Sequence, residues 1–124
     1  MEKRALHRIA MDGLVVHYKK SSNKFLFRPY KKEAVLKDIS KSGLGMVTHE
    51  QLQKGDLLQM RIEFIETKPL TVKGRIRWSQ PSENNGHYRV GIQFLPFGEY
   101  SQYNSLTALQ QLRELSGQSM VMTA

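Results

Sequence analysis

Three residues in the stretch DISKSGLGM have the chemistry to recognise a ligand rich in hydrogen-bonding groups: Asp38, Ser40 and Gly43. A carboxylate accepts hydrogen bonds, a hydroxyl donates and accepts them, and glycine adopts backbone angles closed to other residues. If residues 33–40 form a strand with Val35 and Ile39 inward, Asp38 and Ser40 both lie on its outer face. A plain turn between two strands uses the same residue types and is the alternative interpretation.

A second candidate group lies at the start of the chain, where Arg4 and Arg8 are four residues apart and Lys3 precedes them. On a helix this spacing puts both guanidinium groups on one side, and in an extended segment they also share a face. A guanidinium is a planar fork that binds phosphate, or the O6/N7 edge of guanine, through two hydrogen bonds. The alternative is a disordered basic leader.

Composition limits the classes of protein to which the chain can belong. It has 124 residues, enough for one domain, and it contains no cysteine, which excludes disulfides and thiolate zinc sites. The net charge of +8 is uneven, because residues 1–37 hold ten Lys or Arg and three acidic residues. This asymmetry indicates an anionic partner, or else a solvated basic face. Without a long apolar run or a signal peptide, we expect a cytoplasmic protein.

Three stretches in the middle of the chain alternate apolar and polar residues with a period of two, as half-buried strands do: 57–65, 70–79 and 88–95. Trp78 falls on the apolar side of the second stretch, so we expect it in the core, with stacking against a ligand as the alternative. Gly91 interrupts the third stretch, which predicts a bulge or a close backbone approach. Further short strands are expected at 13–18, 25–27, 33–40 and 43–48.

Six or seven short strands favour a small closed barrel, because closure removes exposed sheet edges. Residues 99–117 differ from the strands, since their leucines recur every three residues among helix formers: Leu106, Leu109, Leu112 and Leu115. This pattern predicts one C-terminal helix that packs on the barrel or on a second subunit. Gly117 stands where a helix C-cap would fall, and residues 118–124 are expected to fray.

The two candidate groups together, R-x-x-x-R at 4–8 and D-x-S-x-x-G at 38–43, followed by strands ending in YRVGIQFL, resemble the PilZ domain family. The resemblance covers roughly residues 3–96, and the chain matches the signature at Arg4, Arg8, Asp38, Ser40 and Gly43. The basic stretch between the motifs, KKSSNKFLFRPYKK, is less regular than the family pattern and leaves the first strand poorly defined.

The resemblance implies an all-β single-domain protein: a six-stranded antiparallel barrel of split or Greek-key-like connectivity with a C-terminal α-helix. Residues 1–12 would be a switch segment carrying the arginine motif, residues 13–98 the PilZ barrel, residues 99–117 the helix and residues 118–124 a tail.

The ligand that the resemblance implies is the bacterial second messenger cyclic di-GMP. Arg4 and Arg8 would clamp a phosphate and the Hoogsteen edge of a guanine. Asp38 would accept hydrogen bonds from guanine N1–H and N2–H, and Ser40 would bond the base or a phosphate. Gly43 would keep a Cβ out of the way of the ligand.

Four more residues are secondary candidates for the ligand site: Lys3, His7, Arg75 and Arg77. A basic residue before the first arginine, as Lys3 is here, resembles family members that bind two stacked ligand molecules. His7 could stack on a base. Arg75 and Arg77 share an outer barrel face with Arg89, which is either a solvated face or an extension of the phosphate site.

The expected function is that of a cyclic di-GMP receptor or adaptor. The anionic ligand would fold the arginine segment against Asp38 and Ser40, and the changed surface would signal to an unidentified effector protein. The resemblance suggests control of motility, biofilm, surface polysaccharide or virulence. The chain could be a monomer or a homodimer, and we expect no insertion into membranes.

Two binding alternatives stay open: a basic barrel that binds nucleic acid, and a PilZ-like module that binds only proteins. Nucleic acid is the less expected partner, because the aromatic residues of the middle strands alternate inward and leave no outer stacking platform. We expect no enzyme, no cofactor and no metal, because acid/base pairs, metal-ligand spacings and nucleophile constellations are missing from the sequence.

Overall fold

A computed structural model of the chain describes residues 9–10, 13–21, 30, 32–64, 67–83 and 86–123, with side chains from residue 13 to residue 115. Within these residues there are seven strands and one helix, in chain order: β1 (Ile9–Ala10), β2 (Val15–Lys20), β3 (Lys32–Ile39), β4 (Gly43–Thr48), β5 (Leu57–Ile62), β6 (Leu70–Pro81), β7 (Tyr88–Phe94) and α1 (Leu106–Thr123). The strand expected at residues 25–27 lies outside the described residues.

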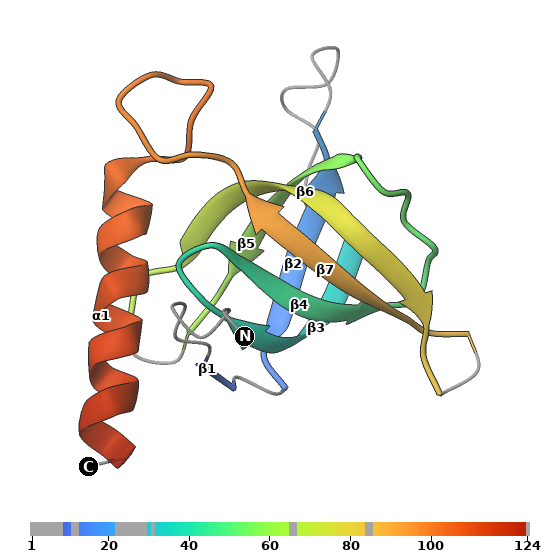
Figure 1. The fold of residues 1–124 in the computed structure, drawn as a ribbon, viewed down its shortest axis with the longest axis horizontal. Coiled ribbons are helices and arrows are strands. Elements are labelled where there is room, and N and C mark those ends of the chain that lie inside the picture. Colours follow the sequence, from blue (N-terminus) through green and yellow to red (C-terminus); the bar gives the residue numbers. More distant parts are fainter. Residues whose placement is uncertain are drawn as a thin grey trace, which may run out of the picture.

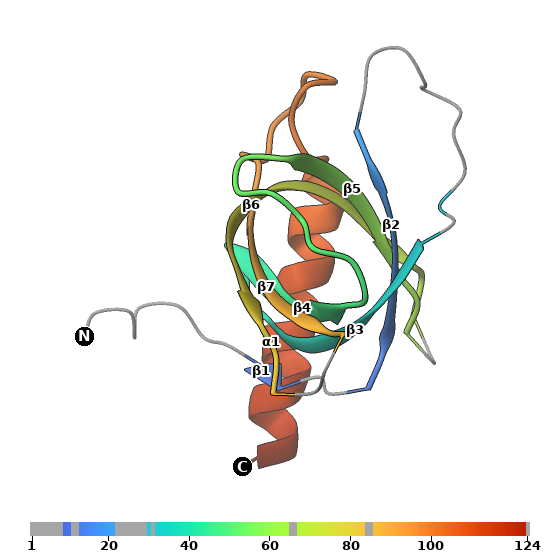
Figure 2. The same ribbon diagram turned by 90° about the vertical axis from the view of Figure 1, so that its right-hand side faces the viewer.

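Six strands close into an antiparallel barrel in the order β3-β2-β5-β6-β7-β4, and β4 pairs back onto β3. The short strand β1 pairs with the end of β3. Figure 1 shows α1 standing along one side of the barrel, and Figure 2 shows the strands curving around its interior. The expected fold class, a six-stranded antiparallel barrel with a C-terminal helix, is confirmed.

The inward side chains of the strands form one apolar core, as the period-two alternation predicts. Along β5 the buried residues are Leu58, Met60 and Ile62, and along β7 they include Val90 and Ile92. The helix adds Ala108, Leu112 and Leu115 to the same core. Barrel closure leaves each of the six strands with a hydrogen-bonded neighbour on both sides, which fixes the backbone position from which each outward side chain starts.

Two β-bulges break the alternation, and each overturns a prediction. The register of β3 shifts between Leu36 and Asp38, so Val35 and Ile39 do not share a face: Ile39 is buried as predicted, and Val35 is 41% exposed. The register of β6 shifts between Ile76 and Trp78, and Trp78 is 43% exposed instead of belonging to the core. A bulge inserts one residue and thereby turns the following side chain to the other face of the sheet.

The helix differs from its predicted bounds at both ends. It begins at Leu106, where the Ser105 hydroxyl caps it by accepting a hydrogen bond from the Ala108 N–H (3.0 Å). It continues through Gly117 to Thr123, because a glycine in a helix costs only about 1 kcal/mol. Leu106 is exposed, since a spacing of three residues drifts around a helix of 3.6 residues per turn. This helix is too polar to span a membrane.

A buried asparagine fixes the loop that leads into the helix. The Asn104 side chain is 3% exposed; it accepts a hydrogen bond from the Lys73 N–H (2.6 Å) and donates to the carbonyls of Lys73 (2.9 Å) and Leu95 (3.0 Å). Asn104 thereby joins the start of β6 to the residue after β7. These contacts use both polar atoms of the amide side chain, which makes Asn104 a clamp for this loop.

A polar cluster joins β2, β3 and the segment that follows β4. The Tyr18 hydroxyl donates a hydrogen bond to Glu50 (2.7 Å), and the Lys32 ammonium forms an ion pair with the same carboxylate (2.9 Å). Burial on its own would raise the pKa of Glu50, but the hydrogen bonds from Lys32 and Tyr18 outweigh burial and hold that pKa below its ordinary value. Burial and the Glu50 carboxylate together raise the pKa of Tyr18.

Replacing Asn104 by alanine should lower the free energy of unfolding by about 2–4 kcal/mol, because backbone groups of Lys73 and Leu95 lose their partner. Urea unfolding of N104A measures this loss. The matched control is Gln102→Ala, an exposed position in the same loop that should stay within about 0.5 kcal/mol of the unaltered chain. Equal stabilities of the two variants would contradict the clamp.

Glu50 should make stability depend on pH in the acid range. A carboxylate whose pKa is lowered by folding contributes stability above its unfolded pKa and loses this contribution as the pH falls through its folded pKa. Urea unfolding of the chain and of E50Q, followed from about pH 7 to about pH 3, should show a stability difference that shrinks on acidification. A difference that stays constant over this range would contradict the assigned role of the Glu50 charge.

Candidate functional site

The candidate site is built on one row of cross-strand partners on the outer face of the barrel. Asp38 of β3 pairs with Gly45 of β4, Gly45 pairs with Gly91 of β7, and Gly91 pairs with Trp78 of β6. The strands β4 and β7, which carry the two glycines, lie side by side in Figure 1. Neighbouring strands are about 4.8 Å apart, so the row spans about 14 Å between its two ends.

The side chains at the two ends lean over the glycines. The carboxylate of Asp38 lies 3.3 Å from the point that a Cβ on Gly45 would occupy. The indole of Trp78 occupies the space that a Cβ on Gly91 would need, which confirms the predicted close approach at Gly91. The two middle positions of the row thus carry no side chain of their own: the Trp78 indole covers Gly91, and the Asp38 carboxylate lies beside Gly45. We call these two residues the glycine floor: Gly45 and Gly91.

Ser40 is not on the outer face, and this overturns the prediction of its orientation. Its side chain is 2% exposed, its Oγ accepts a hydrogen bond from the Ser42 N–H (3.2 Å), and it lies 3.1 Å from the Ser42 Oγ. The Ser40 N–H donates to the carbonyl of Gly43 (2.9 Å). Ser40 therefore shapes the turn between β3 and β4, and Ser42, which is half-buried, lies closer to the surface.

The packing of the barrel also explains why residue 43 is a glycine, and the sequence alone did not reveal this. It is buried, and a Cβ there would overlap the carbonyl oxygen of Ile92 in the neighbouring strand. Its φ angle is not among the positive ones, which belong to Gly13, Gly55 and Gly86. Gly43 thus allows close packing of β4 on β7, and clearance for a ligand is not required to explain it.

Exposed cations stand on both sides of the glycine floor. Arg77, at the bulge before Trp78, donates a hydrogen bond to the Gln93 side chain (2.9 Å) on β7. Arg89 of β7 pairs with Val47 of β4, two residues from the glycines along each strand. Arg75 lies farther along β6 and donates to the carbonyl of Gly55 (3.2 Å). The predicted common outer face of the three arginines is confirmed, since all are exposed.

Four predicted site residues lie outside the described residues: Lys3, Arg4, His7 and Arg8. The backbone that follows them is described, and it runs beside the candidate site. Ile9 pairs with Ile39 and Ala10 pairs with Asp38, in the short ladder between β1 and β3. The strand β1, which directly follows Arg8 in the sequence, thus lies beside the end of β3 that carries Asp38.

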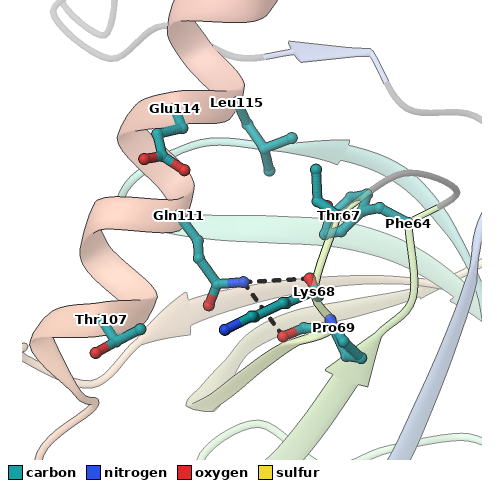
Figure 3. Close-up of a pocket in the computed structure, with 8 residues that line it drawn as sticks. All are labelled: Phe64, Thr67, Lys68, Pro69, Thr107, Gln111, Glu114 and Leu115. Carbon is teal, nitrogen blue, oxygen red and sulfur yellow. Dashed lines mark hydrogen bonds between the residues drawn. The ribbon is translucent and has the colours of Figure 1, made fainter.

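A separate cavity of about 280 Å³ lies between α1 and the connection from β5 to β6 (Figure 3). Leu115 and Phe64 line it, and Gln111 crosses it to donate hydrogen bonds to the carbonyls of Lys68 (3.2 Å) and Pro69 (3.3 Å). Lys68 is the single cation among the lining residues of this cavity, and Asp38 is not among them. The cavity thus has one cation and one carboxylate, Glu114, in its lining, whereas several exposed arginines stand beside the glycine floor.

Metal binding was not expected, and among the described residues no group of three or more His, Cys, Asp or Glu side chains could hold a metal ion. His49 and His87, which look scattered in the sequence, stand with ring centroids 4.3 Å apart. They lie next in the sequence to Thr48 and Tyr88, the last pair of the ladder between β4 and β7.

The family model of the PilZ domain matches residues 2–112 of this chain. Curated proteins offer no match to the sequence.

Solved structures of low sequence identity share the fold. The PilZ domain of YcgR from Escherichia coli, solved with c-di-GMP, aligns with a TM-score of 0.64 at 15% identity and covers 98% of this chain and 95% of its own. YcgR from E. coli in complex with c-di-GMP gives 0.71 at 18%, covering 99% and 48%, respectively. The Bacillus subtilis inhibitor of motility MotI (DgrA) gives 0.68 at 15%, covering 98% and 53%. This chain spans about half the length of these last two proteins.

A match over nearly the whole chain, a closed six-stranded barrel and the arginine and D-x-S-x-x-G motifs in their expected order lead to one assignment. The chain belongs to the PilZ domain family.

Proposed function

We propose that this domain is a receptor for cyclic di-GMP, which it binds over the outer face of β3, β4, β7 and β6. The observation that supports this most is the position of Asp38, an acceptor at one end of the outer row whose glycines have exposed arginines on both sides. The ligand has two guanine bases and two phosphates, so it needs an acceptor for N1–H and N2–H together with cations for the phosphates. YcgR, with the same fold, was solved in complex with c-di-GMP.

Arg4 and Arg8 supply the remaining cations in this proposal. Arg8 directly precedes β1, whose residues Ile9 and Ala10 pair with Ile39 and Asp38. In this proposal both guanidinium groups would contact a ligand bound to Asp38, with Lys3 and His7 as secondary contacts. We also propose that Lys3 allows a second, stacked ligand molecule to bind. The stoichiometry measured by calorimetry decides between one and two ligand molecules per chain.

Binding would also change the conformation of the chain. Without ligand, the like charges of Lys3, Arg4 and Arg8 repel one another. The ligand carries two negative charges, which would offset this repulsion and draw the arginine segment onto the barrel next to β3. The surface formed in this way would recognise an effector protein, as a cytoplasmic adaptor does. The population shift is limited by the difference in ligand affinity between the two conformations.

The direct test is a calorimetric titration with cyclic di-GMP. The chain should bind with a Kd of about 1 μM or tighter, and alanine at Arg4, Arg8 or Asp38 should weaken binding at least about tenfold, which corresponds to about 1.4 kcal/mol. A chain that binds GTP and random oligonucleotides as tightly as cyclic di-GMP would contradict the proposal.

The matched control removes cations from another wall of the barrel. Lys19 and Lys20 lie on β2, where they pair with Gln59 and Leu58 of β5. Their replacement by alanine should change the Kd by less than about twofold. If these lysines matter as much as the two arginines, the chain attracts polyanions diffusely and has no specific site.

Ser40 and Ser42 should differ in how they affect the chain. S40A removes the acceptor of the Ser42 N–H and should cost about 1–3 kcal/mol of unfolding free energy, with weaker ligand binding as a consequence. S42A keeps that N–H and should cost less than about 1 kcal/mol. Denaturant unfolding and calorimetry on the same samples separate the two effects. If S40A keeps full stability but loses affinity, Ser40 contacts the ligand directly and the turn-forming role is wrong.

A further inference from the structure

Three valines form a row on the outer face of neighbouring strands: Val15 of β2, Val35 of β3 and Val47 of β4. Val15 and Val47 are the cross-strand partners of Val35 on its two sides. Val15 is 40% exposed, Val35 is 41% exposed and Val47 is half-buried. The row, which we call the valine strip, runs across the strands and is about 10 Å long. One exposed valine is ordinary, but three in register form a contiguous apolar surface that another molecule can cover.

Opposite charges flank the middle of the valine strip along β3. Glu33 lies two residues before Val35 and Lys37 lies two residues after it; all three are exposed, and the two residues between them are buried. Side chains two residues apart on a strand share a face, so acid, valine and base stand in line, about 7 Å apart. The Glu33 carboxylate lies 3.7 Å from Nδ1 of His17, and 66% of the Glu33 side chain stays exposed.

This order of charges is complementary to itself. Rotation of a second copy by 180° about an axis along the valine strip reverses the direction of β3 and sets Glu33 of one copy opposite Lys37 of the other. The same rotation packs each valine against the same valine of the second copy. An axis parallel to β3 would set Glu33 against Glu33 and Lys37 against Lys37. The charges therefore favour the first orientation, and a second copy carries the matching pattern by definition.

We propose that two copies of this chain associate through the valine strip, with Glu33 and Lys37 pairing across the two-fold axis. This inference goes beyond the ligand site and does not depend on it. The surface is far smaller than the about 800 Å² per partner of a stable dimer, and each copy carries a net charge of +8. Arg89, which follows Val47 in the cross-strand row, also faces Arg89 of the second copy at the edge. The association is therefore weak, with a Kd of about 0.1 mM.

Sedimentation equilibrium without ligand tests the association. From about 10 μM to about 1 mM chain, the weight-average mass should rise from the monomer towards the dimer. Val35→Lys buries a cation at the centre of the strip and should raise the Kd at least about tenfold. The matched control is Leu106→Lys, which adds the same charge at an exposed leucine of α1 and should stay within about twofold. Circular dichroism checks that both variants are folded.

Exchange of the two charges tests the orientation. E33K and K37E each set like charges opposite one another at two symmetric places and should raise the Kd at least about fivefold at low salt. The double variant E33K/K37E restores opposite charges and should return to within about twofold of the unaltered chain. K37E also lowers the net charge of the chain, so general repulsion between copies predicts the opposite change for this variant.

Three results would overturn the inference. The first is a chain that stays monomeric up to about 1 mM. The second is a dimer that V35K leaves intact while L106K disrupts it, since the contact would then lie on α1. The third concerns the axis: if K37E strengthens association, or if the double variant is weaker than both single variants, Glu33 and Lys37 do not face each other.

Discussion

The candidate site depends on two β-bulges, one at each end of a four-residue row across the barrel wall. The bulge in β3 re-aims Asp38 and the bulge in β6 re-aims Trp78, so both side chains stand outside the barrel over backbone that carries no side chain. In a regular alternation, a residue at the Trp78 position would fill the core. A bulge changes the direction of single side chains and leaves the hydrogen-bonded frame around them intact.

This arrangement is held by the closed frame around it. The six strands have hydrogen-bonded partners on both sides, which keeps the register of β4 and β7 and with it the pairing of Gly45 and Gly91. Asn104 joins the start of β6 to the end of β7, so the strand that carries Trp78 cannot slide along its neighbour. The site is therefore preorganised on the barrel side, and the arginine segment is the part that ligand binding would add.

The sequence predicts the architecture well, because period-two alternation in the middle strands has a single cause, burial of one face. The sequence-based prediction fails at Val35 and Trp78, where a bulge shifts the alternation by one residue. A bulge depends on how two strands pair, and the local sequence pattern does not reveal this pairing. Ser40 was predicted outward because the alternation was extended past Ile39, where β3 ends and the turn to β4 begins. The glycines at 45 and 91 were a usable signal, since a glycine inside an apolar strand marks a bulge or a close approach.

Amide chemical shifts followed during a titration with cyclic di-GMP test the central claim most directly. Shifts of the Asp38, Gly45 and Gly91 amides and of the Trp78 indole N–H, with little change on β2 and β5, are the predicted result. Shifts concentrated around the cavity beside α1 or on β2 and β5, with the glycine floor unchanged, would contradict the account.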